Sequence, residues 1–168
     1  MESLHAPWRI DYILGPKSPM GDQSLFTRIA QSSDDEANYV LFRGRTCYAL
    51  LNAYPYNGGH LMVVPYRQTS EWNDLNDQEL LELMHLVRRC QNALREVMRP
   101  QGFNIGVNLG RVAGAGVVEH LHVHVVPRWD GDVNFMPLIA GTSVVPEALK
   151  ETAAKLRRVM EITTEKPY

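Results

Sequence analysis

The sequence of 168 residues has very little cysteine and no long apolar run. Only Cys47 and Cys90 are present, one in a strand-like stretch and one in a helix-like stretch. This argues against a disulfide scaffold and favours a reducing, cytosolic setting. The N-terminus carries no apolar signal segment, and no run of 18 apolar residues occurs. We therefore predict a cytoplasmic protein that does not enter a membrane.

An excess of charge of one sign is also absent. The 17 Lys and Arg residues nearly balance the 19 Asp and Glu residues, so the formal net charge is -2. Nucleic acid and anionic membrane surfaces are therefore not expected partners, and any phosphate must be recognised by a few local residues. The hydrophobic fraction of 45% and the charged fraction of 21% are typical of a globular protein. This chain length suits one domain with a substantial core.

The order of predicted elements indicates the α+β class. Strand-like runs are expected at residues 39–42, 46–51, 60–65, 103–109 and 119–126. A long amphipathic helix is expected over 76–98, opened by Asn76 and Glu79 as a capping pair, and a C-terminal helix over 146–163. Such an order favours an antiparallel sheet with helices packed against it.

The N-terminal part lacks the helix and strand periodicity of the later segments. Residues 1–12 show no clear period, and residues 15–35 are rich in Gly, Pro, Ser and Asp. We predict that residues 1–38 form an arm and loop lying on a single domain of residues 39–168. Within that loop, a short apolar island at 24–27 is expected to pack against the domain.

The stretch from Glu119 to Trp129 carries the most specific signal. His120, His122 and His124 alternate with branched apolar residues. A period of two is that of a strand, so the three imidazoles are expected on one face and the apolar side chains in the core. Pro127 is expected to end this strand, because proline cannot donate to a ladder of hydrogen bonds.

Three interpretations of the histidine row are open. The histidines could be polar residues on a solvent face, or they could ligate a metal, since His-x-His on a strand lets both rings reach one ion. No cysteine lies near, however, and Glu119 should point to the opposite face. In the third interpretation, a neutral imidazole attacks phosphorus while neighbouring imidazoles and the backbone of the loop 110–116 donate to phosphoryl oxygens. The last explains most features together.

Three motifs in order resemble the histidine triad (HIT) family of nucleotide hydrolases and transferases. They are the His120 to His124 triad, the segment from Asn52 to Gly59-His60, and Asn108-Leu109-Gly110. Within the family, residues 54–57, the run through Trp129 and the arm 6–9 are similar to the bacterial diadenosine-tetraphosphate phosphorylase branch. The resemblance implies a HIT-like antiparallel sheet with one long helix and a C-terminal helix, and a homodimer.

The resemblance also implies roles for individual residues. His122 would attack the α-phosphorus and carry the nucleotidyl group, His124 would donate to a phosphoryl oxygen, and His120 would help to order the site. Substrate contacts would come from Asn52, His60, Asn108, Gly116 and Trp129. On residue type alone, the asparagines could equally be turn residues, His60 could satisfy its own backbone, and Trp129 could cover the edge of the core.

Two departures from the family pattern matter. Many HIT proteins hold zinc through Cys-x-x-Cys and a later histidine, but the matching places here are Ser24, Thr27 and Gln68. We therefore predict no structural zinc, no catalytic metal and no other cofactor. Residues 115–117, just before the triad, are Ala-Gly-Val and offer no side-chain donor to phosphate or a leaving group. This leaves open whether water or orthophosphate accepts the nucleotidyl group.

The functional prediction is an enzyme that cleaves dinucleoside polyphosphates, such as diadenosine tetraphosphate, through a nucleotidyl-His122 intermediate. It would act as a hydrolase or as a phosphorylase. The alternative, suggested by the missing donor before the triad, is a module that binds AMP or ADP with little or no turnover. A metal-dependent enzyme is the third class, and it predicts activity that is lost in chelator.

Overall fold

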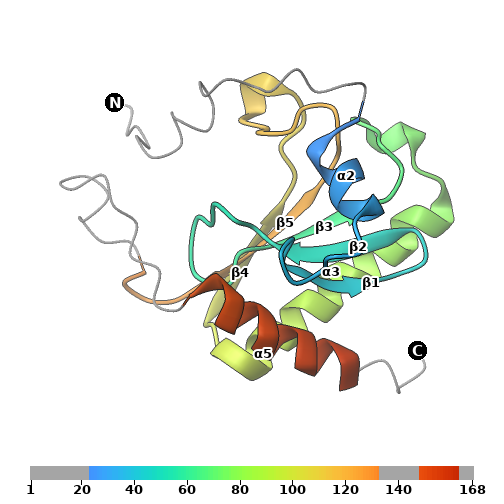
Figure 1. The fold of residues 1–168 in the computed structure, drawn as a ribbon. Coiled ribbons are helices and arrows are strands. Elements are labelled where there is room, and N and C mark those ends of the chain that lie inside the picture. Colours follow the sequence, from blue (N-terminus) through green and yellow to red (C-terminus); the bar gives the residue numbers. More distant parts are fainter. Residues whose placement is uncertain (1–22, 133–147, 163–168) are drawn as a thin grey trace, which may run out of the picture.

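The computed structural model describes residues 23–132 and 148–162. These residues form a five-stranded antiparallel sheet with the strand order β1-β2-β3-β5-β4 (Figure 1). The strands are β1 (Val40–Arg43), β2 (Cys47–Leu51), β3 (Leu61–Pro65), β4 (Gly102–Gly106) and β5 (Val123–Arg128). The helices are α2 (Leu25–Gln31), α3 (Asp77–Met98) and α5 (Leu149–Ile162), with the short 3₁₀ turns η1 (Trp72–Asp74) and η2 (Arg111–Ala113). The predicted α+β class is confirmed.

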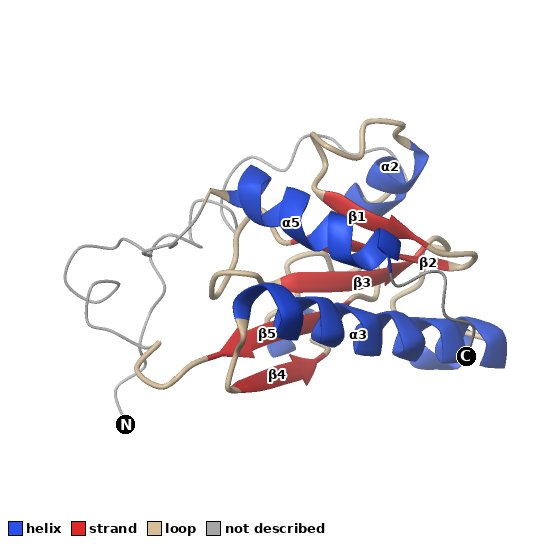
Figure 2. Cartoon of the chain, turned by 90° about the horizontal axis from the view of Figure 1, so that it is seen from below, coloured by secondary structure: helices blue, strands red, loops and turns tan. Residues whose placement is uncertain are grey.

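The sheet is covered differently on its two faces. Helices α3 and α5 lie side by side on one face (Figure 2), where they bury the larger of two apolar clusters. Leu121, Val123 and Val125 belong to this cluster. Helix α2 covers part of the opposite face, where Phe26 packs with residues of β2 and β3 in the second cluster. Within the described ranges, no helix has the length and apolar character needed to cross a membrane.

Helix α3 begins where the sequence predicts. Asn76 is its N-cap and accepts a hydrogen bond from the Glu79 N–H, while the Glu79 carboxylate accepts from the Asn76 N–H, which completes a capping box. The helix ends at Met98, and Arg99 follows in the left-handed conformation. Helix α5 starts at Leu149, and Pro146 of the predicted helix lies outside the described residues.

The prediction of loop structure over 15–35 is wrong for its second half. Residues Leu25–Gln31 form α2, because Ser24 caps the helix and Phe26 is buried against the sheet. Such a short helix gains its stability from tertiary packing rather than from propensity. The packing predicted for the apolar island is confirmed, while residues 1–22 lie outside the described part. The domain boundary at residue 38 stays a prediction.

The predicted strand of histidines is partly wrong. Strand β5 begins at Val123, so His120 and His122 precede it, and the Leu121 N–H donates to the Thr69 carbonyl instead of a ladder partner. The strand also runs through Pro127 to Arg128. The Pro127 carbonyl accepts from the Asn57 side chain rather than from β3, whose pairing with β5 ends at Val125. A proline fits there, because no donor is needed on that side.

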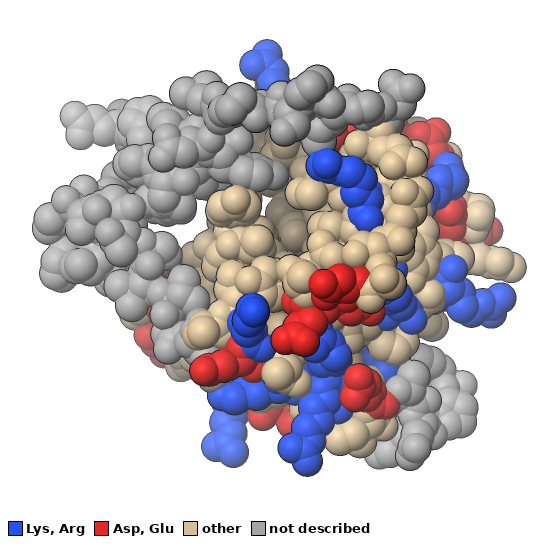
Figure 3. Space-filling view, in the orientation of Figure 1, with Lys and Arg blue, Asp and Glu red and all other residues tan. Residues whose placement is uncertain are grey.

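Charge is distributed as the composition suggests. On the face shown in Figure 3, acidic and basic side chains lie interspersed rather than gathered by sign. Among the described residues, ion pairs join Arg43 with Asp35, Arg67 with Glu79, and Arg128 with Asp132. On this face, the residues that the structure describes form no basic stripe of the kind that binds nucleic acid.

Candidate active site

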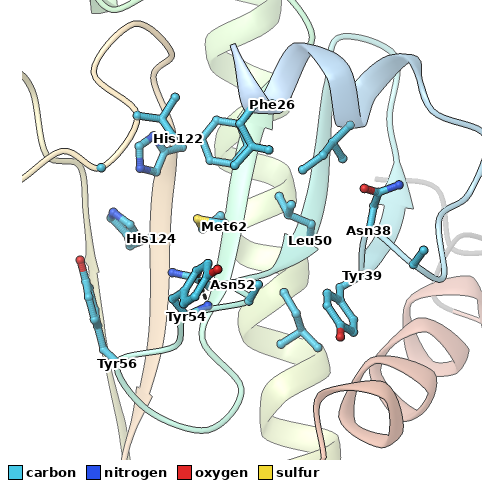
Figure 4. Close-up of a pocket in the computed structure, with 17 residues that line it drawn as sticks. Phe26, Asn38, Tyr39, Leu50, Asn52, Tyr54, Tyr56, Met62, His122 and His124 are labelled. Carbon is cyan, nitrogen blue, oxygen red and sulfur yellow. Dashed lines mark hydrogen bonds between the residues drawn. The ribbon is translucent and has the colours of Figure 1, made fainter. Parts of the chain in front are cut away.

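A cavity of about 380 Å³ lies on the sheet face opposite α3. His122 and His124 line one end, and Asn38 and Tyr39 line the other (Figure 4). Apolar side chains of α2, β2 and β3 form the wall between them, among them Phe26, Leu50 and Met62. A mostly apolar cavity with a few polar groups at its ends is typical of a site for a small organic ligand.

The position of its proton suits His122 to act as a nucleophile. Its Nδ1 lies 2.8 Å from the carbonyl oxygen of His120. Because a carbonyl can only accept, Nδ1 carries the proton, and the lone pair of the neutral ring is on Nε2. Burial lowers the pKa of His122, and the hydrogen bond to His120 opposes this in part. A neutral imidazole with a free Nε2 is therefore favoured near pH 7, as nucleophilic attack requires.

In His124 the other ring nitrogen, Nε2, carries the proton, and the contact with His60 fixes this arrangement. The Tyr56 N–H and the Asn52 Nδ2 group lie 3.1 and 3.3 Å from Nδ1 of His60, and both can only donate, because the Asn52 Oδ1 accepts from the Tyr54 N–H. Nε2 of His60 must then carry the proton and donate to Nδ1 of His124, 2.9 Å away. In its neutral form His124 is consequently protonated at Nε2. The ring therefore presents an N–H donor rather than a lone pair.

The two histidines complement each other chemically. Their ring centroids are 4.8 Å apart, with the rings edge to face, and both side chains line the cavity. One supplies a lone pair and the other a donor. That combination suits a phosphoryl group, whose phosphorus accepts a nucleophile while its oxygens accept hydrogen bonds.

His120 is turned away from this pair. Its Nε2 donates to the Pro65 carbonyl at 2.9 Å, and its Nδ1 lies 2.6 Å from the Ser24 hydroxyl, which donates to it. Burial lowers the pKa of His120, and the hydrogen bond to Pro65 opposes the shift. The ring is 1% exposed and is not part of the cavity lining. Its contribution to the site is the carbonyl that holds His122.

The residues at the zinc positions of the resemblance form hydrogen bonds instead. The Gln68 Oε1 accepts from the Ser24 N–H at 2.8 Å and from the Thr27 hydroxyl at 3.0 Å. Structural zinc is held by thiolates and imidazoles, and neutral hydroxyl and amide oxygens do not fit it. Within residues 23–132 and 148–162, no group of three or more His, Cys, Asp or Glu side chains could hold a metal ion. That the protein binds no metal stays a prediction.

The structure brings together some of the predicted substrate-binding residues. Asn52 and Gly116 line the cavity, and His60 lies behind His124. Asn108 and Trp129 are not part of the lining. The Trp129 N–H donates to the Asp132 carboxylate just beyond β5. The roles predicted for these residues remain predictions.

Sequence reasoning missed most of the apolar wall and the end opposite the histidines. Leu50 and Met62 are register partners on β2 and β3, and they point to the face opposite Leu51 and Leu61. Both strands are buried on both faces, so no polar alternation marked which residues meet a ligand. Asn38 lies in a turn with no local motif, and no signal in the sequence could have singled it out.

Acidification is predicted to destabilise the fold between pH 7 and pH 5. The pKa values of His120 and His122 are lowered in the folded chain, whereas an unfolded histidine has a pKa of about 6.5. The unfolded state therefore binds more protons as pH falls through about 6.5, and stability decreases until the folded pKa values are passed. Scanning calorimetry across this range measures the effect. A His122→Phe variant should show a shallower decline, and a melting temperature that rises on acidification would contradict the prediction.

Known proteins match the chain over most of its length. The HIT domain family model matches residues 34–131. The AP-4-A phosphorylase of Mycobacterium tuberculosis strain H37Rv is 48% identical over 158 residues, which cover 90% of this chain and 80% of that protein. The asymmetrical bis(5'-nucleosyl)-tetraphosphatase of Schizosaccharomyces pombe is 34% identical over 100 residues, or 60% of this chain and 54% of that protein.

Solved structures agree with these matches. A hypothetical histidine triad nucleotide-binding protein from Sulfolobus tokodaii superposes with a TM-score of 0.68 at 25% identity, covering 84% of this chain and 94% of that one. A zinc-bound histidine triad family protein from Mycobacterium smegmatis has the same fold, with a TM-score of 0.67 at 23% identity, covering 86% and 98% of the two chains. The family model, the relatives and the histidine geometry lead to one conclusion: this chain belongs to the HIT family.

Proposed function

We propose that the protein cleaves dinucleoside polyphosphates, with diadenosine tetraphosphate as the representative substrate, through a covalent nucleotidyl-His122 intermediate, and that orthophosphate is the acceptor. The observation that carries this proposal is that His122 presents a lone pair and His124 an N–H donor in the same cavity. The names of the two relatives support the substrate class, and the name of the 48% identical relative supports phosphate as acceptor.

In the first step, the Nε2 lone pair of His122 attacks the α-phosphorus. The Nε2–P bond forms while the bond from phosphorus to the bridging oxygen breaks, and the leaving polyphosphate keeps that electron pair. The Nε2–H of His124 donates to a non-bridging oxygen and stabilises the charge that develops there. From diadenosine tetraphosphate, this step releases ATP and leaves AMP bound to His122 as a phosphoramidate.

In the second step, an oxygen of orthophosphate attacks the same phosphorus. The Nε2–P bond breaks and returns its electron pair to Nε2, so the product is ADP. The Nδ1–H of His122 stays with the His120 carbonyl throughout, 2.8 Å away. This contact stabilises the positive charge of the intermediate, and the cationic imidazole leaves more readily than a neutral one would. No proton has to move within the site during the cycle.

Product analysis with and without phosphate tests the proposal. Purified protein and diadenosine tetraphosphate should yield equal amounts of ADP and ATP, and only when orthophosphate is present. AMP plus ATP in the absence of phosphate would assign water as the acceptor instead. Tight binding of AMP with no turnover under either condition would contradict the proposed enzyme and favour the binding module.

We also propose that the protein is a cytoplasmic homodimer. Cys47 and Cys90 are buried thiols, which suits a reducing compartment, and burial raises the pKa of Cys47 to about 11. Strand β4 lies at an edge of the sheet with its last three residues exposed, so this edge is open to a second copy. A monomeric molar mass by light scattering would contradict the dimer.

A further inference from the structure

The cavity has a direction, which the nucleophile sets. His122 and His124 lie at one end, Asn52 and Tyr54 lie along the middle, and Asn38 lies at the far end (Figure 4). If the α-phosphate sits at His122, the nucleoside must extend away from the histidines, along the apolar wall. The edge of its base then meets Asn38. This reasoning rests on the proposed function for the orientation of the nucleotide.

The amide of Asn38 is held in one orientation. Its Nδ2 lies 2.7 Å from the carbonyl oxygen of Asp34 and 3.0 Å from the hydroxyl oxygen of Ser32. A carbonyl can only accept, so the atom facing Asp34 must be the nitrogen, and the opposite flip would place two acceptors together. Both amide protons are used within the turn that precedes β1.

The other end of the amide faces the cavity. Figure 4 shows the Asn38 oxygen on the side of the apolar wall and the nitrogen on the far side. Asn38 therefore offers an acceptor to a ligand and has no proton left to donate. Apolar side chains such as Ile29 and Leu50 line the same cavity, which strengthens the preference for a ligand that supplies a donor.

We propose that Asn38 determines base specificity by accepting a hydrogen bond from an exocyclic amino group on the base, so that the site selects adenine nucleotides. A purine without this group would leave the Asn38 oxygen buried without a donor. A 6-oxo purine would place an acceptor against it and would have to shift to avoid the repulsion. Losing one such hydrogen bond weakens binding by roughly fivefold to tenfold.

Calorimetric titration with two matched ligands tests this inference. AMP and purine riboside 5'-monophosphate differ only by the amino group, and the wild-type protein should bind AMP more tightly by about fivefold to tenfold. Asn38→Leu should bring the ratio of the two dissociation constants to about one. Ser32→Ala removes one bond that holds the amide but keeps the one to Asp34, and it should preserve the preference for AMP.

The ratio of the two dissociation constants distinguishes the loss of a specific contact from general damage to the turn. If Asn38→Leu merely loosened the turn, both ligands would bind more weakly by the same factor and the ratio of their dissociation constants would stay unchanged. That result, equal affinities in the wild-type protein, or failure to bind AMP would each overturn the inference. Because binding needs no turnover, a preference for AMP in a protein that does not cleave diadenosine tetraphosphate would leave this inference standing and refute the proposed function.

Discussion

Replacing His122 with alanine is expected to reduce turnover of diadenosine tetraphosphate by at least about 10⁴-fold, because it removes the atom that we propose bonds to phosphorus. Hydrogen bonding supports this role for Nε2, since the His120 carbonyl holds the proton at Nδ1 and leaves the lone pair on Nε2. Steady-state assays of ADP and ATP release measure the loss. Brief reaction of the wild-type protein should also leave an acid-labile AMP adduct, visible by intact mass spectrometry and absent from His122→Ala.

A matched control is available on the same chain. His85 lies on α3, which packs on the other face of the sheet, and His85→Ala should keep wild-type turnover and the adduct. The His122→Gly variant offers a second check, since added imidazole can occupy the vacated space and should restore part of the activity. Full turnover by His122→Ala would refute the nucleophilic mechanism outright.

Replacing His60 with phenylalanine is expected to lower kcat by about 10²-fold, although His60 does not line the cavity. His60 donates to Nδ1 of His124 and thereby keeps the proton of His124 on Nε2. Without this donor, His124 can place its proton on Nδ1 and present a lone pair to the phosphoryl oxygens, where a donor is required. The variant should therefore lose transition-state stabilisation while AMP affinity changes much less.

A double-mutant cycle tests whether His60 acts through His124 or whether its loss simply disrupts a buried site. His124→Phe removes the donor directly, so His60→Phe should cost little more when it is added to that background. If the losses of kcat in the two single variants were additive in the double variant, His60 would not act through His124. Melting temperatures of all three variants should be measured in parallel, because His60 is fully buried and its hydrogen bonds to Asn52 and Tyr56 are lost with it.

Residues that recur at a fixed spacing made part of the site predictable from the sequence. The alternation around His122 predicted correctly that Leu121, Val123 and Val125 face the core and that His122 and His124 share the other face. The start of the strand could not be predicted the same way. An extended segment has the same period whether or not a neighbour pairs with it, and β3 pairs with β5 only over Val123 to Val125.

The local sequence also misjudged α2. The segments 15–24 and 32–35 are rich in Gly, Pro, Ser and Asp and led to a loop prediction for the whole stretch, although none of these residues occurs at 25–31 itself. Residues 25–31 fold as a helix because Ser24 caps it and Phe26 fills a space above β2 and β3 that exists only once the sheet has formed. Ser24 also donates to His120, 96 residues along the chain, which no local pattern could indicate.

The sequence by itself determined the α+β class, the long helix with its capping box, and the three histidines on which the family assignment rests. These depend on spacings within one segment, and a periodicity of two or of 3.6 residues can be read there directly. Only the tertiary structure decided what each polar group offers to a ligand. Whether His122 presents a lone pair, His124 a proton or Asn38 an oxygen depends on the partner of its other polar atom. For His124 that partner is His60, 64 residues away in the chain, which folding alone brings to 2.9 Å.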